Sequence, residues 1–185
     1  MTRRPRASRR DWLRYLGAVA GAGVAGCAEP VGPGGDEGGD DGDAATAAGG
    51  TERPLTGYET TEVAVRTPDG DRLGSVTAAV ADTPGTRYRG LSGVGSLPED
   101  RGMLFVFGDV AERTFVMRGM EFGLDIVYAD ADGVITRIHH APAPGPNEDG
   151  SEQRYPGRGR YVLEVVYGWT TDRGVGTGDV LAFDL

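Results

Sequence analysis

The stretch 102–130 constrains the fold of this chain most, because three short apolar segments follow one another there with glycines between them. Residues 103–107 are a continuous apolar run bounded by glycines, which is too short for a helix and typical of a strand buried on both faces. Residues 114–117 and 124–128 are rich in aromatic and β-branched side chains, which favour strands. The stretch therefore predicts three closely spaced strands at the centre of a sheet.

Other β-prone runs lie on both sides of this stretch, at residues 60–67, 72–81, 134–140, 161–167 and 180–185. The first two flank a Pro-Asp-Gly-Asp turn and predict a hairpin. Thr83 and Pro84 offer a cap followed by proline, which predicts a short helix. One helical turn is expected at 169–175, and an exposed loop at 142–159, where proline, glycine and charged residues dominate. The predicted fold is mainly β: a small barrel-like or strongly curved sheet domain with one or two short helices.

The first 26 residues have the features of an export leader. They carry six arginines against one acid, and their apolar segment is far shorter than the roughly 20 residues that span a bilayer. Arg9 and Arg10, followed by an aromatic residue, resemble a twin-arginine export signal. Residues 1–26 are therefore expected to be a signal peptide of this type.

Cys27 is the only cysteine of the chain, so no disulfide within the chain can form. The preceding Val-Ala-Gly resembles a lipobox, after which a cysteine is acylated and becomes the new N-terminus. Two acyl chains give stable anchoring where one is marginal. We expect membrane lipid as a partner through Cys27, and a location on the cell surface, at the outer face of the cytoplasmic membrane. The alternative is a lone free thiol.

Residues 27–57 are expected to be a disordered acidic tether, since they contain almost no large apolar side chain and cannot offset the entropy of ordering. The β-rich domain is then expected at 58–185. Acids exceed bases by nine in the whole chain, and every base is arginine. A strongly negative surface of this kind disfavours nucleic acid as a partner, and it is typical of halophile-like composition.

Several motifs in order give the chain a family resemblance. They are Arg-Gly-Leu at 89–91, the apolar run at 102–107, Phe-Val-Met-Arg at 115–118, Leu-Asp-Ile at 124–126, Tyr-Val-Leu-Glu at 161–164 and Gly-Asp at 178–179. The chain resembles, over about 63–183, the family called domain of unknown function 192. The resemblance implies a small, mainly β, barrel-like domain that is often exported and has no established activity. It also implies tryptophan where this chain has Val116 and asparagine where it has Gly119, so a site at those positions would be altered here.

Two carboxylates interrupt apolar strand segments. Strand alternation places Glu164 on one face with two valines, and Asp125 in phase with Val127. A carboxylate in such a place is costly unless it is partnered. Arginine can hold a carboxylate with two hydrogen bonds. We therefore expect Glu164 and Asp125 to meet Arg118 and Arg89 in a polar pocket at the mouth of the barrel. The alternatives are a structural ion pair without a ligand and a solvated edge.

Metal binding has little support in the sequence. His139 and His140 are the only histidines, and adjacent strand residues point to opposite faces, so they are poorly placed to share a metal. Met117 and Met120, with a histidine nearby, could form a soft copper site, but methionine more often fills gaps in a core. No cofactor and no resident metal site is expected.

The sequence favours a lipid-anchored binding or accessory module for a polar small ligand or a partner protein. One alternative is an envelope-associated hydrolase that uses Glu164 or Asp125 as acid or base. The other is a carrier of copper or another metal. Whether the chain is an enzyme is left open, because no catalytic triad, phosphate loop or zinc motif is present.

Overall fold

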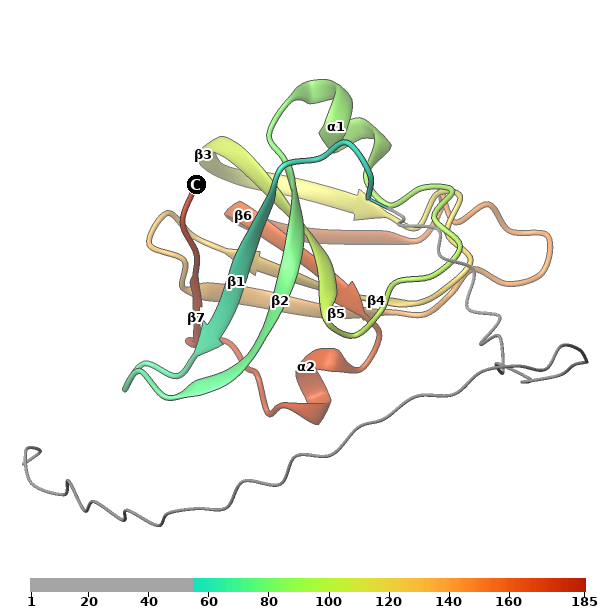
Figure 1. Cartoon of the computed structure of the whole chain (residues 1–185). Helices are drawn as coiled ribbons and strands as arrows, with labels where there is room; N and C mark the ends of the chain where they lie inside the picture. Colours follow the sequence, from blue (N-terminus) through green and yellow to red (C-terminus); the bar gives the residue numbers. More distant parts are fainter. Residues whose placement is uncertain (1–54) are drawn as a thin grey trace, which may run out of the picture. The chain divides into compact units, whose positions relative to one another are not determined.

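A computed structural model describes residues 55–185, which form a curled sheet with two short helices (Figure 1). The strands are β1 (Thr60–Arg66), β2 (Arg72–Ala81), β3 (Arg101–Val116), β4 (Leu124–Ala129), β5 (Ile135–Ala141), β6 (Arg154–Val166) and β7 (Val180–Ala182). The helices are α1 (Pro84–Arg89) and α2 (Trp169–Asp172). The predicted fold class is confirmed. The expected leader, Cys27 and most of the expected tether lie outside the described residues.

The seven strands form one sheet in the order β5-β4-β6-β3-β2-β1-β7. All neighbours are antiparallel except β2 and β3. The two edge strands are also tied to each other. A bridge joins Val134 to Val180, and the Ile135 N–H donates to the Asp179 carbonyl at 2.8 Å. The sheet therefore curls until its edges meet, which gives the barrel-like form and protects edge groups that would otherwise be unpaired.

The interior of the curl is filled from all seven strands. Its buried members include Val63, Val65, Val76, Ala78, Leu104, Val127, Ala129, Ile135, Leu163, Val165 and Leu181, with Trp169 of α2 packed against them. Because successive strand side chains alternate between faces, the remaining apolar positions of β2 to β6 point outward.

A second core lies on that outer face. It contains Ala79, Ala81, Met103, Phe105, Leu124, Ile126, Tyr128, Ala141 and Val162 from the strands, covered by Leu91, Leu97, Met117 and Met120. No member comes from β1 or β7. The segment around α1 and the residues after β3 therefore cover only part of the sheet, and the candidate site lies under this cover. In residues 55–185 neither helix has the length and hydropathy needed to cross a bilayer.

Two predictions about element boundaries were wrong. Residues 103–107 and 114–117 belong to one 16-residue strand, β3, and β6 begins at Arg154, inside the expected loop 142–159. The pairing of β3 with β6 shifts register between Val106 and Ala111. Beyond the shift, residues 111–116 of β3 pair with residues 154–159 of β6, so the two strands stay paired past the apolar run. Glycine at 157 reflects close packing and not a turn, since a Cβ there would lie 2.6 Å from the Tyr128 ring.

The helix α1 begins where the cap predicts. Thr83 and Thr86 form a reciprocal capping box and Pro84 occupies the first turn. Gly90, at φ 53°, ends the helix. α2 covers the start of the helical turn expected at 169–175.

Candidate functional site

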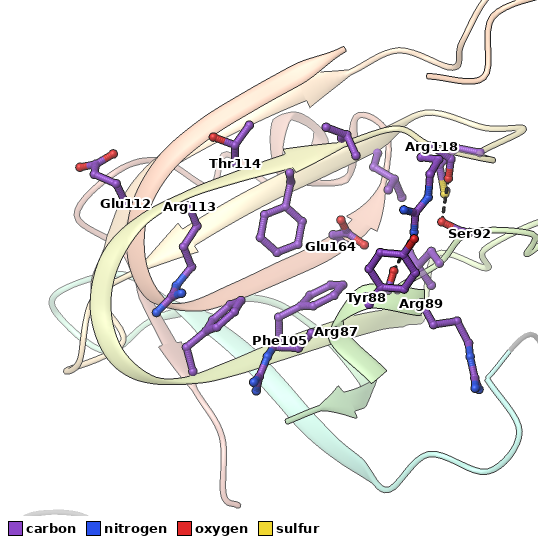
Figure 2. Close-up of a pocket in the computed structure, with 17 residues that line it drawn as sticks. Arg87, Tyr88, Arg89, Ser92, Phe105, Glu112, Arg113, Thr114, Arg118 and Glu164 are labelled. Carbon is purple, nitrogen blue, oxygen red and sulfur yellow. Dashed lines mark hydrogen bonds between the residues drawn. The ribbon is translucent and has the colours of Figure 1, made fainter. Parts of the chain in front are cut away.

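A pocket of about 460 Å³ lies on the outer face of the sheet, between α1 with the residues after it and the far half of β3 (Figure 2). Its apolar walls are Leu91, Phe105, Phe107, Phe115, Val116, Met120 and Leu124. Its ionisable lining residues are Arg87, Tyr88, Arg89, Glu112, Arg113, Arg118 and Glu164. The pocket thus combines an apolar body with a charged surround, as small-molecule sites commonly do.

Glu164 of β6 supplies the carboxyl group of this pocket. The strand register sets it opposite Met103 of β3 and Ile126 of β4, so its side chain emerges on the outer face among apolar neighbours. The residue is 5% exposed. Within residues 55–185 no ion pair involves it. Burial raises the pKa of Glu164 to about 8, because desolvation disfavours the charged form. At neutral pH the group is mostly protonated and can donate a hydrogen bond.

The arginines of the pocket stack on aromatic rings. The Arg113 guanidinium lies 3.6 Å from the centre of the Phe107 ring, and it also pairs with Asp109 at 2.9 Å. The Arg118 guanidinium lies 4.3 Å from the centre of the Tyr88 ring and donates to the Tyr88 carbonyl at 2.8 Å. Stacking and backbone bonds of this kind fix a guanidinium while leaving some of its five N–H donors free.

The expected direct contact between Arg118 and the two carboxylates does not form. In the described part of the chain Arg118 has no ion pair with Glu164 or Asp125. Arg118, Arg89 and Glu164 nevertheless line one pocket. Figure 2 shows Arg118 at the Tyr88 end of the hollow that holds Glu164, whereas Arg89 extends away from it. A role for these three residues in ligand binding stays a prediction.

Asp125 lies on the opposite face of the sheet, so the predicted cluster of two carboxylates was wrong. Its pairing partners are His140 and Val165, while Glu164 pairs with Ile126, one residue along. A shift of one residue reverses the face. Asp125 is fully buried and accepts bonds from Thr170 Oγ1 at 2.6 Å, the Thr170 N–H at 2.8 Å and the Gly168 N–H at 3.1 Å. Asp125 Oδ2, which accepts both bonds from Thr170, thus holds the start of α2.

The histidines lie on opposite faces, as the strand pattern predicts. His140 Nδ1 contacts Asp125 Oδ1 at 2.7 Å, and His139 Nε2 lies 2.8 Å from the Pro156 carbonyl. Met117 and Met120 are buried in the outer core. No group of three His, Cys, Asp or Glu suited to a metal occurs in residues 55–185. Copper binding has no structural observation in its favour.

The aromatic walls and Arg113 were not among the predicted site residues. Phe105 and Phe107 are two apart on β3, as are Arg113 and Phe115, so each pair shares a face. This spacing was visible in the sequence. What it could not show was that β3 bends across the register shift and brings both pairs to one pocket.

Comparison with known proteins assigns the domain. The model of the family domain of unknown function 192 (DUF192), described as "Uncharacterized ACR", matches residues 64–183. The chain belongs to this family. No curated protein matches the chain.

Two solved structures resemble this DUF192 chain. One is a protein of unknown function from Novosphingobium aromaticivorans DSM 12444, with 27% identity and a TM-score of 0.61, covering 78% of this chain and 99% of that one. The other is a protein from Sinorhizobium meliloti 1021 for which a role as a transcription regulator has been suggested, with 28% identity and a TM-score of 0.60, covering 68% of this chain and 95% of that one. Val116, where the family resemblance implies tryptophan, lines the pocket, so a wider pocket is expected here than in relatives with that ring.

Proposed function

We propose that the DUF192 domain of this chain is a binding module that takes a polar small ligand into the pocket on its outer face. One observation carries the proposal: Glu164 is a buried residue, 5% exposed, that lines a hollow of about 460 Å³ and has no ion-pair partner among residues 55–185. A polar group in such a place costs free energy unless something hydrogen-bonds to it. A ligand in the pocket would supply that bond.

A ligand panel tests the proposal. Thermal unfolding of the full-length chain is measured with sugars, organic acids, amines and phosphate. We expect at least one class to raise Tm, since a ligand that binds only the folded state stabilises it. Glu164→Leu, which removes the carboxyl group from the lining, should abolish the shift, whereas Ser96→Leu, exposed and outside the lining, should not. A panel in which no class raises Tm would count against a ligand pocket.

We propose further that the chain is a lipoprotein held at the outer face of the cytoplasmic membrane through acylated Cys27. The support is sequence alone: the arginine pair Arg9 and Arg10, the small residues before Cys27 and the acidic segment after it. Cys27→Ser should move the protein from the membrane fraction to the soluble fraction. Replacing Arg9 and Arg10 by lysine should keep it in the cytoplasm. A Cys27→Ser variant that stays with the membrane would contradict the anchor.

Acid catalysis is the second candidate function, because a carboxyl with its pKa near 8 can donate a proton at neutral pH. Asp125 lies on the other face and gives no help, so a hydrolase would depend on Glu164, with Glu112 of the lining as the remaining acid. Ester or glycoside hydrolysis that Glu164→Gln abolishes would favour this function. The regulator role suggested for the Sinorhizobium protein finds no support in the net charge of −9, which disfavours DNA.

A further inference from the structure

The walls of the pocket show what the body of a ligand must be. Three phenylalanine rings and the side chains of Leu91, Met120 and Leu124 line it. Two of the rings, Phe105 and Phe115, meet edge to face at 4.8 Å between centres. Rings held in this way offer flat apolar surfaces to an aromatic or branched aliphatic group. A sugar could stack one C–H face on a ring, but the hydroxyls around its edge would meet few hydrogen-bond partners among these apolar walls.

The charge around the pocket shows what the polar end of a ligand must be. Four arginines line it against one exposed glutamate, Glu112, and the buried Glu164. Arg113 is neutralised by Asp109. Arg87, Arg89 and Arg118 form no ion pair within residues 55–185, although Arg118 is near enough to Asp149 to contribute to the lowered pKa of that exposed carboxyl. The surplus of positive charge favours an anion and disfavours an amine.

Arg118 and Glu164 are placed to share that anion. Both side chains line the same pocket, and within residues 55–185 they form no ion pair with each other. Arg118 uses one Nη2–H bond for the Tyr88 carbonyl, which leaves other guanidinium donors for a ligand. A protonated Glu164 donates one O–H bond. A planar carboxylate has two oxygens and can accept from both groups.

We infer that the ligand is a small organic carboxylate with an aromatic or branched apolar body, held at its carboxylate by Arg118 and Glu164 and at its body by the phenylalanines. This inference rests on the proposed function and narrows it to one chemical class. Phosphate and sulfate esters without an apolar body would leave the aromatic walls unfilled.

The inference requires that binding weaken as pH rises. Burial raises the pKa of Glu164 to about 8, and ionised Glu164 would repel a carboxylate. The groups that face it from the cover are Arg87, Tyr88 and Arg89 of α1 with Arg118. Those from the strands are Glu112 and Arg113 of β3 and Tyr128 of β4. Burial raises the pKa of the Tyr128 hydroxyl, and Glu164 raises it further. Glu112 is the one other carboxyl among these groups, and it is exposed to solvent. We therefore assign the pH dependence of binding to Glu164.

The test uses phenylacetate as the probe, with the full-length chain and isothermal titration calorimetry. Phenethylamine and glucose are the comparison probes. We expect phenylacetate alone to bind, with Kd rising about 30-fold from pH 7 to pH 9.5, as the protonated fraction of a group with that pKa falls. Glu164→Gln keeps a donor and should bind within about threefold of the parent at pH 7, with the pH dependence lost. Arg118→Gln should weaken binding at least about tenfold. Arg137→Gln, exposed and outside the pocket, is the control and should change nothing.

Each other outcome has a distinct meaning. Binding of phenethylamine or glucose in place of phenylacetate, lost in Glu164→Leu, would overturn the carboxylate class and leave the binding module standing. Absence of binding by every probe would overturn this inference, and with the full ligand panel also negative it would overturn the proposed function. If phenylacetate binds with a Kd that changes neither with pH nor in Arg118→Gln, its binding site lies elsewhere, and this result would also overturn the inference.

Discussion

Glu164 occupies a position that its strand would fill with an apolar side chain for stability alone. Val162 and Val165 beside it are fully buried, and its cross-strand partners are Met103 and Ile126. Burying an ionised carboxylate there would cost several kcal/mol, so the group keeps its proton instead. Residues that break the local apolar pattern in this way are more often found at functional sites than elsewhere.

The stability of the domain should therefore depend on pH through Glu164. The folded pKa is raised to about 8 from 4.5, so between these values the folded state retains a proton that the unfolded state has lost. Stability should fall as pH rises through this window, by up to about 1.4 kcal/mol per pH unit, and level off above it. Glu164→Gln removes this dependence, and urea unfolding at pH 5.5 and 7.5 measures it. Parent and variant curves that stay parallel across the two pH values would show that Glu164 is ionised when folded.

The sequence identified Glu164 and Asp125 correctly as misplaced charges, because alternation along one strand is enough to find them. It could not assign their partners. Whether Glu164 faces Asp125 or Ile126 depends on the register between β4 and β6, and a one-residue shift in register changes the face. The residues of the two strands do not by themselves specify that register, since it also depends on the turns and on which face is buried.

At the scale of elements, Asp125 joins β4 to β5 and α2. His140 of β5 contacts one of its oxygens and Thr170 of α2 binds the other. α2 has only one turn and Gly168 provides no side-chain cap, so Asp125 takes the place of a cap. The buried carboxylate thus has a structural role, which is the alternative that the sequence left open.

Asp125→Ala should destabilise the domain by about 3 kcal/mol, since it orphans a buried hydroxyl and two backbone N–H groups. His140→Ala should cost about 1 kcal/mol or less, because the His140 side chain is half exposed and can turn to water. Urea unfolding at pH 7 compares the two variants. Equal losses would mean that the histidine contact, and not the α2 contacts, holds Asp125 in place.

The two long strands depend on glycines at close approaches. Gly157 of β6 faces the ring of Tyr128, whose hydroxyl donates to the Tyr155 carbonyl at 2.6 Å. The sequence shows glycine, proline and charge at 142–159 and predicts a loop, because composition does not distinguish a glycine in a turn from one under a ring. The apolar centres of the strands were predictable, whereas their polar extensions were set by tertiary pairing.

Gly157→Ala should cost about 2 kcal/mol, because its Cβ would lie 2.6 Å from the Tyr128 ring and force the ring or the strand to move. Gly108→Ala, in β3 with no atom within 4 Å of the added Cβ, is the matched control and should be neutral or slightly stabilising. Thermal unfolding of both variants makes the comparison. A Gly157→Ala variant as stable as Gly108→Ala would indicate that the β6 arm does not pack against Tyr128.

At the scale of the whole molecule, the main apolar core and the candidate site lie on opposite faces of the sheet. The inside of the curl holds an apolar core from all seven strands together with the buried Asp125, and the bridge between Val134 and Val180 joins its two edges. The pocket lies outside, where α1 and the bent half of β3 cover the sheet. The sequence predicted the barrel-like fold and three of the lining residues, but it placed the site at the mouth of the barrel, because the curvature of β3 depends on pairings distant in sequence.

The central claim is that Glu164 stays uncharged at neutral pH in a pocket that a ligand can reach. Carbon-13 NMR of the full-length chain, with Glu164 assigned by comparison with Glu164→Gln, measures its titration directly. The account predicts a midpoint at about pH 8, moving upward when phenylacetate is added, because the anion favours the protonated form. A midpoint near the ordinary value of 4.5, unmoved by phenylacetate, would contradict it.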